Sequence, residues 1–145
     1  MNPLTEITNK EYEKLLLFPV YISLLAANMD GRLDEKQKRT AIKFAHIKTY
    51  TCDPMFEDYY LEADKEFESN IESLDNELPK DKKSREKAIK KELLDIEKIV
   101  TKLGDRYIDK IHKSMDSFKE HVLKAHHSIF MDFLMPVPIS GLNDR

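Results

Sequence analysis

The longest run of apolar positions covers residues 15–27, where polar side chains are almost absent. A helix that is apolar on every side has no face for solvent, so we expect this one at the centre of a bundle. Thr8 and Glu11 form the pattern of a capping box at its start, which predicts a helix over residues 9–28. Pro19 falls inside this segment and predicts a kink or a break into two pieces.

Further helices follow from start and stop signals along the rest of the chain. Asp34 and Gln37 repeat the capping-box pattern, and Asp53 before Pro54 places a side-chain cap and a proline at another helix start. Gly104 is placed to end a helix, because glycine adopts the positive φ that helix ends favour. Between these signals, apolar residues recur at intervals of three and four, as on one face of a helix. The predicted helices cover residues 35–49, 54–78, 82–103 and from 105 onward, with at most a short helix after 129.

These elements predict an all-α fold. Only 3 glycines and 6 prolines occur in 145 residues, and the alternating β-branched segments that predict strands are scarce. We therefore expect one domain over residues 1–145, built as a compact bundle of about six helices. The helices over 54–78 and 82–103 are long and joined by a tight loop, so we expect them to form a long antiparallel hairpin.

Charge is distributed unevenly between these two long helices. Residues 53–78 contain ten acidic side chains and one lysine, whereas residues 80–102 contain nine basic and five acidic ones. The basic segment is either a face for an acidic partner or a nucleic acid, or it neutralises the acidic helix beside it and is otherwise solvated, which we favour. The net charge of −3 argues against general affinity for nucleic acids, so we expect the partner to be another protein.

The compartment is suggested by the apolar segment and by the cysteine content. Residues 15–27 are too few to span a bilayer, which takes about 20 apolar residues, and they lack the flanks of a secretory leader. Cys52 is the only cysteine, so no disulfide forms within the chain, and we interpret it as a small loop residue without a catalytic partner. We expect a cytoplasmic protein with no membrane span.

The junction after the apolar helix is the first candidate for chemistry. Asp30 and Asp34 place short carboxylates around Gly31, and calcium favours such oxygen ligands at a sharp glycine turn. The segment does not fit the EF-hand pattern, because Ala26 and Gln37 stand at the positions where an EF-hand loop has its first and last ligands. Two interpretations stay open. The turn is a cation site with Asp30 and Asp34 as ligands, or it is a capped helix connection in which Asp34 starts the second helix.

A resemblance to a known family rests on the same residues. The segment 26–37, Ala-Ala-Asn-Met-Asp-Gly-Arg-Leu-Asp-Glu-Lys-Gln, resembles the signature of the TerB-like superfamily of tellurite-resistance-associated proteins. The resemblance implies a compact, pseudo-duplicated helical domain with a role in stress responses. It also implies metal binding through Asp30 and Asp34, and it carries over no catalytic residue. It further implies a second copy of the turn, for which residues 130–144 are the candidate.

The last long helix carries a second set of candidate ligands. Asp109, His112 and Asp116 recur at intervals of three and four, which keeps them near one face of the helix. Acids with one histidine suit a transition metal, and the alternative, which we favour, is the solvated edge of an amphipathic helix. Two further groups are interpreted structurally. They are the surface histidines His121, His126 and His127, and the core aromatics Phe56, Tyr59, Tyr60 and Phe67.

Together these patterns favour a binding protein over an enzyme. The chain contains no glycine-rich phosphate loop, no Gly-x-Ser-x-Gly, no His-Glu-x-x-His and no Cys-x-x-Cys. The first hypothesis is a stress-response protein that binds a divalent metal ion through the turn at Asp30. The alternative is a metal-free protein–protein interaction module that uses a charge-segregated helical surface.

Overall fold

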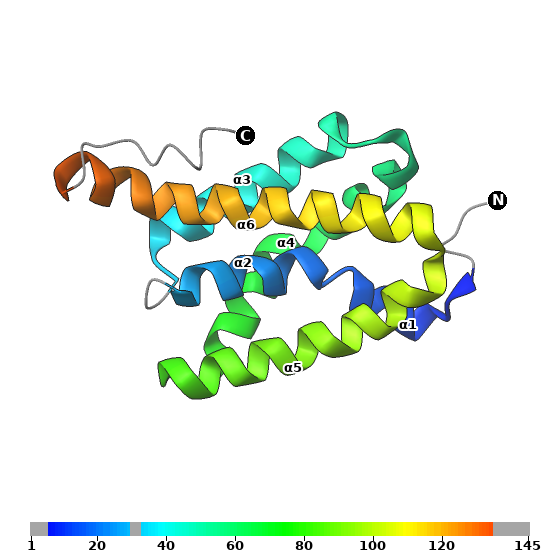
Figure 1. The fold of residues 1–145 in the computed structure, drawn as a ribbon, viewed down its shortest axis with the longest axis horizontal. Helices are drawn as coiled ribbons and strands as arrows, with labels where there is room; N and C mark the ends of the chain where they lie inside the picture. The colour runs from blue at the N-terminus through cyan, green and yellow to red at the C-terminus, as the bar shows by residue number, and fades with distance from the viewer. Residues whose placement is uncertain (1–5, 30–32, 135–145) are drawn as a thin grey trace.

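The described part of the chain is entirely helical. The computed structural model describes residues 6–29 and 33–134, with side chains described as far as residue 123, and these ranges contain no strand. The expected all-α class is therefore confirmed (Figure 1). The elements are α1 (Asn9–Leu15), α2 (Phe18–Met29), α3 (Glu35–Thr51), η2 (Pro54–Phe56), α4 (Glu57–Glu77), α5 (Lys82–Val100), η3 (Thr101–Leu103) and α6 (Asp105–Leu134).

The predicted break at Pro19 is confirmed. The first helix ends at Leu15, and Pro19 is the second residue of α2. Because proline has no N–H, the carbonyl of Leu15 lacks the donor that a continuous helix would supply four residues later. The hydroxyl of Tyr59 on α4 donates to this carbonyl at 2.7 Å, so the break also fixes where α4 crosses the start of α2.

The other helix boundaries follow the predicted signals closely. Thr8 forms the predicted capping box with Glu11 at the start of α1. The Asp53 side chain accepts from the backbone N–H of Met55 at 3.0 Å, which starts a short 3₁₀ turn before α4. Gly104 has a φ of 92° between η3 and α6, where an L side chain would be strained. The tightened turns η2 and η3 were not predicted, and α3 ends at Thr51, two residues beyond its predicted end.

The predicted antiparallel hairpin of the two long helices is wrong. The structure describes α4 and α5 in full, and they do not pack along each other: α4 packs mainly on α3, and α5 packs on α2 and α1. In Figure 1, α2 lies between α5 and α6, and α4 crosses behind it. The cause is α2 itself, because a helix that is apolar on all sides needs several neighbours to cover it.

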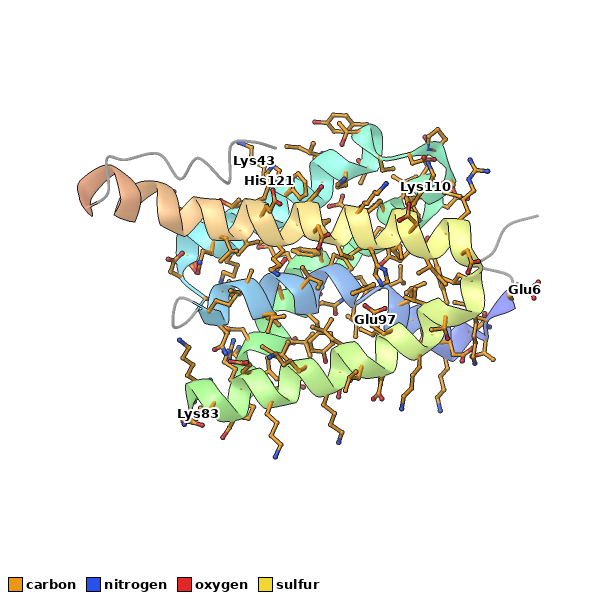
Figure 2. All side chains as sticks on the ribbon, viewed as in Figure 1. Glu6, Lys43, Lys83, Glu97, Lys110 and His121 are labelled. Carbon is orange, nitrogen blue, oxygen red and sulfur yellow. The ribbon has the colours of Figure 1, made fainter. Side chains whose placement is uncertain are left out.

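The core surrounds α2 and is rich in aromatic rings. Figure 2 shows side chains filling the space between α2, α5 and α6. Phe56, Tyr59, Tyr60 and Phe67 are each at most 2% exposed, which confirms their interpretation as core residues. Their rings meet those of neighbouring aromatic residues mostly edge to face, an arrangement that adds stability beyond burial alone. None of the described helices has the length and apolar content that crossing a membrane requires.

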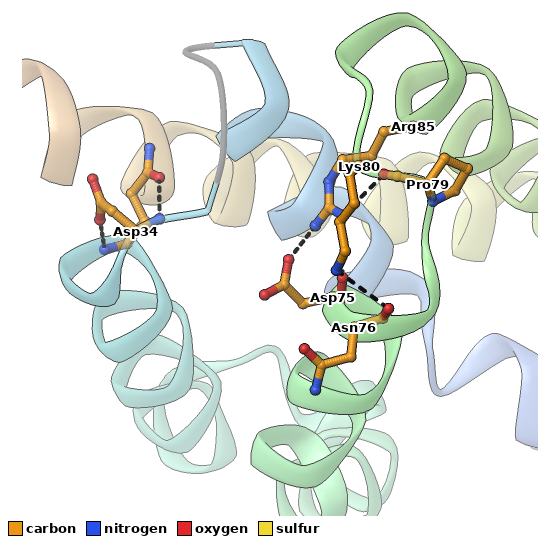
Figure 3. A network of polar contacts seen from close by, with 7 residues as sticks. Asp34, Asp75, Asn76, Pro79, Lys80 and Arg85 are labelled. Carbon is orange, nitrogen blue, oxygen red and sulfur yellow. Dashed lines mark hydrogen bonds and ion pairs between the residues drawn. The ribbon is translucent and has the colours of Figure 1, made fainter.

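One buried cation ties the ends of α4 and α5 together. The Arg85 side chain is only 1% exposed and forms an ion pair with Asp75 on α4. Its Nη1 also donates to the carbonyls of Asp75 at 3.2 Å and Pro79 at 3.4 Å (Figure 3). Within the described residues this is the sole ion pair between α4 and α5. The two helices therefore meet through their connection and not along their lengths.

Candidate functional site

The capped-connection interpretation of Asp34 is confirmed. The Oδ1 atom of Asp34 accepts from the backbone N–H of Gln37 at 2.6 Å, and the Gln37 side chain accepts from the Asp34 N–H at 3.2 Å (Figure 3). This reciprocal pair is a complete capping box at the start of α3. Asp30 and Gly31 lie outside the described residues, as does most of the second candidate turn, 135–144. Cation binding at Asp30 therefore stays a prediction.

The acidic face of α6 is engaged in separate surface contacts. His112 lies 2.7 Å from Glu97 of α5, measured from Nε2 to Oε1, and Asp109 lies 3.4 Å from the ammonium of Lys113. Asp116 is exposed one turn further on. Among the residues whose positions the structure describes, no three histidine, cysteine or acidic side chains converge in a way that could hold a metal.

The remaining histidines divide between described and undescribed side chains. His121 lies on the surface, with its Nδ1 2.9 Å from the carbonyl of Ser117 and its ring stacked on Phe44 at 3.8 Å between centroids. This agrees with its interpretation as a surface residue. The side chains of His126 and His127 lie outside the described part.

The outer side of α5 carries a row of lysines around one exposed leucine. Figure 2 shows side chains ending in nitrogen along this edge, with Lys83 labelled near its start. Leu94 lies within the row and is 64% exposed, a high value for a large apolar side chain. We call this surface the α5 ridge, and it consists of Lys83, Lys87, Lys90, Lys91, Leu94 and Lys98, all of them exposed.

Three of the four acids of α5 have partners away from this row, and the fourth, Glu86, pairs with one of its lysines. Glu92 and Asp95 both contact the ammonium of Lys14 on α1, at 3.3 and 3.4 Å. Glu97 contacts α6 through His112, and Glu86 pairs with Lys90 at 2.8 Å. Lys90 is the one member of the α5 ridge that forms an ion pair within the described residues.

Within the described residues, only Arg85 of the basic segment neutralises an acid of α4, and the exposed lysines agree with the expectation that the rest of the segment is solvated. The charged side chains of α4 and α5 contact different neighbouring helices, because α2 and not α4 covers the inner face of α5. Segregation of charge along the sequence therefore becomes segregation on the surface.

A hollow of about 240 Å³ lies where the end of α3 meets α6. Its lining includes three lysines, Lys48, Lys110 and Lys113. Hydroxyls come from Thr51 on α3 and from two serines of α6, while Cys52, Asp53 and Phe56 complete the wall. Sequence reasoning missed this site because α3 and α6 are distant in the chain. The available signal was the spacing of Lys110, Lys113, Ser114 and Ser117, which places them on one face of α6.

Cys52 is poorly suited to nucleophilic chemistry in this hollow. It caps the C-terminus of α3, where its backbone N–H donates to the carbonyl of Lys48 at 3.2 Å. Burial raises the pKa of the Cys52 thiol, an effect that the nearby Lys48 ammonium only partly opposes. The reactive thiolate is therefore disfavoured at neutral pH, in agreement with the interpretation of Cys52 as a structural loop residue.

Comparison with known proteins leaves the family open. No protein-family model, no curated protein and no solved structure matches this chain.

Proposed function

We propose that this protein is a metal-free binding module whose α5 ridge docks an acidic helix of a partner protein. One observation carries the proposal. The acids of α5 are paired with Lys14, Lys90 and His112, while the lysines of the ridge surround an exposed leucine. A row of cations with an apolar centre is complementary to a helix that presents carboxylates around an aliphatic residue.

The apolar centre of the ridge favours a protein over a nucleic acid as the partner. Leu94 gains from burial against an apolar side chain, and a phosphate backbone offers none. The exposed acids of α4, together with the net charge of −3, repel an extended polyanion that would pass beyond the ridge. A compact acidic helix avoids this repulsion because it covers α5 alone.

The proposal is tested with a fluorescent helical peptide that carries glutamate and leucine on one face and alanine elsewhere. Fluorescence anisotropy should show binding that weakens with added salt, because exposed charges are screened beyond about 8 Å at physiological ionic strength. Reversing two ridge charges with Lys87→Glu and Lys91→Glu should weaken binding at least about tenfold. Both side chains are exposed, so we expect the variant to fold normally.

Matched controls separate the ridge from general electrostatic attraction. Lys36→Glu with Lys43→Glu makes the same charge change on the exposed side of α3 and should leave binding within about twofold. A peptide with glutamine in place of glutamate should bind weakly. Equal binding by both double variants would contradict the proposal. Two other results would also contradict it: binding of a DNA duplex to the ridge without binding of the peptide, and self-association of the protein through the ridge without binding of the peptide.

We further propose that the chain is a TerB-like domain of about six helices. The resemblance of segment 26–37 supports this, together with the capping box at Asp34 and the central position of α2. The same resemblance supports a second function, in which Asp30 contributes a carboxylate to a divalent cation. It also motivates a role in stress responses, and the single cysteine fits the reducing cytoplasm as its compartment.

Calorimetric titration tests the metal proposal directly. The metal-stripped protein should release or absorb heat with at least one of calcium, magnesium, manganese and zinc. Loss of a carboxylate ligand in Asp30→Asn should weaken this binding by about tenfold or more. Asp58→Asn removes an exposed carboxylate from α4 and should have no effect. Absence of heat at millimolar metal, or an equal effect of both substitutions, would rule out a ligand role for Asp30.

A further inference from the structure

The hollow between α3 and α6 lies apart from the α5 ridge and has a chemistry of its own. Three lysines from two helices line it: Lys48 from α3, and Lys110 and Lys113 from α6. We propose that this hollow binds a small phosphate-bearing ligand, either inorganic phosphate or a compact phosphate monoester. Lysine is suited to this role, because its ammonium acts as a mobile point charge that donates three hydrogen bonds.

Among the lysines of the hollow, Lys48 has the least charge compensation from the described residues. Its ammonium lies 5.4 Å from the centre of the Phe44 ring and 5.9 Å from that of Tyr60, and no carboxylate pairs with it within the described residues. Cation–π contacts replace only part of the hydration that this half-buried group loses. Burial accordingly lowers the pKa of the Lys48 side chain. A bound oxyanion would supply the missing counter-charge.

The other two lysines have partners that leave the hollow with an excess of positive charge. Lys110 pairs with Asp53 at 2.8 Å, and Asp53 is the only carboxylate that the described residues contribute to the lining. Lys113 contacts Asp109 at 3.4 Å, but both side chains are largely exposed, so this pair is weak and exchanges easily with water or a ligand. The lining of the hollow therefore contains three lysines and one aspartate among the described residues.

The size and walls of the hollow limit the ligand. About 240 Å³ is below the range of typical drug-sized pockets, about 300–1,000 Å³, so the ligand is small. Phe56 gives the wall an apolar part, which suits the organic group of a monoester. The Ser117 hydroxyl makes only a long contact of 3.5 Å with the carbonyl of Lys113, so it can turn to donate to a phosphate oxygen.

Binding is tested by following backbone amide resonances during titration with inorganic phosphate and, separately, with phenyl phosphate at constant ionic strength. We expect saturable shifts at the end of α3 and on the facing turns of α6, larger than those caused by chloride. Tighter binding of phenyl phosphate would identify a monoester as the ligand, whereas equal affinity would identify phosphate itself. Both ligands should also slow the alkylation of Cys52 by iodoacetamide, because Cys52 lines the same hollow.

Two substitutions and one control make the test specific. Lys48→Met keeps an apolar chain over the aromatic rings and should weaken binding about tenfold, the typical effect of losing one charge-assisted hydrogen bond. Lys113→Met changes an exposed side chain, so it should weaken binding without affecting the fold. Lys43→Met, on the exposed side of the same helix as Lys48, should change nothing.

The two binding proposals fail independently. Lys48→Met should leave binding of the acidic peptide to the α5 ridge unchanged, since the two sites lie on different helices. Shifts no larger than those of chloride, or equal phosphate affinity in Lys48→Met and Lys43→Met, would overturn the phosphate site and leave the ridge unaffected.

Discussion

Replacing Asp75 by alanine is expected to lower the free energy of unfolding by about 3–5 kcal/mol, the usual cost of removing one partner from a buried ion pair. Arg85 is only 1% exposed, so the substitution leaves a buried guanidinium without a carboxylate partner. Its remaining contacts are two carbonyls, at 3.2 and 3.4 Å, and its Nε has no acceptor within the described residues. The loss is a large part of the total stability of a typical domain, about 5–15 kcal/mol.

Urea denaturation followed by circular dichroism measures this effect. Glu77→Ala, two residues further along α4, removes an exposed carboxylate without an ion pair in the described structure, and should change stability by less than about 0.5 kcal/mol. Arg85→Met should cost less than Asp75→Ala, because it removes the buried charge along with the pair. Equal stability of the Asp75 and Glu77 variants would show that the ion pair does not stabilise the fold.

Local structure could be predicted from the sequence because its causes are local. The capping box at Asp34, the break at Pro19 and the helix end at Gly104 each depend on residues within one or two turns. The hairpin of α4 and α5 could not be predicted correctly for the opposite reason. A periodic apolar face shows that a helix is covered, but it does not show which helix covers it. The sequence shows that α2 is apolar on all sides. It does not show that α5 packs on α2 in place of α4.

The candidate surfaces show the same division between local and distant causes. The spacing of Lys83, Lys87 and Lys91 on one helical face is visible in the sequence. The sequence does not show that acids of α5 contact Lys14 and His112, because these partners lie on α1 and α6. The hollow between α3 and α6 is still harder to predict from the sequence, since it forms only where the end of α3 meets α6.

The buried tyrosines should make the fold collapse in alkali over a narrow range of pH. Burial raises the pKa of Tyr21 to about 12, and it also raises the pKa values of Tyr59, Tyr60 and Tyr107 above the ordinary value. A group whose pKa is higher in the folded state stabilises the fold fully below its unfolded pKa, about 10 for tyrosine. As the pH rises above 10, the unfolded chain loses these protons and the folded chain keeps them, so stability falls.

The expected slope distinguishes this cause from general charge repulsion. Each buried tyrosine contributes about 1.4 kcal/mol per pH unit, so four together approach about 5 kcal/mol per pH unit between pH 10 and 12. Loss of helical circular dichroism should therefore coincide with the appearance of tyrosinate absorbance in one cooperative step. Gradual tyrosine ionisation at constant helix content would contradict this prediction.

Single tyrosine substitutions test the slope group by group. The Tyr107 hydroxyl is buried and has no hydrogen-bond partner among the described residues, so Tyr107→Phe removes an ionisable group without breaking a contact. This variant should reduce the slope by about 1.4 kcal/mol per pH unit, and at neutral pH it should be as stable as the parent or more so. Tyr50→Phe is the control, because Tyr50 is 70% exposed, and its slope should not change. An identical slope in all three proteins would mean that alkaline unfolding has another origin, such as the growing negative charge of the whole chain.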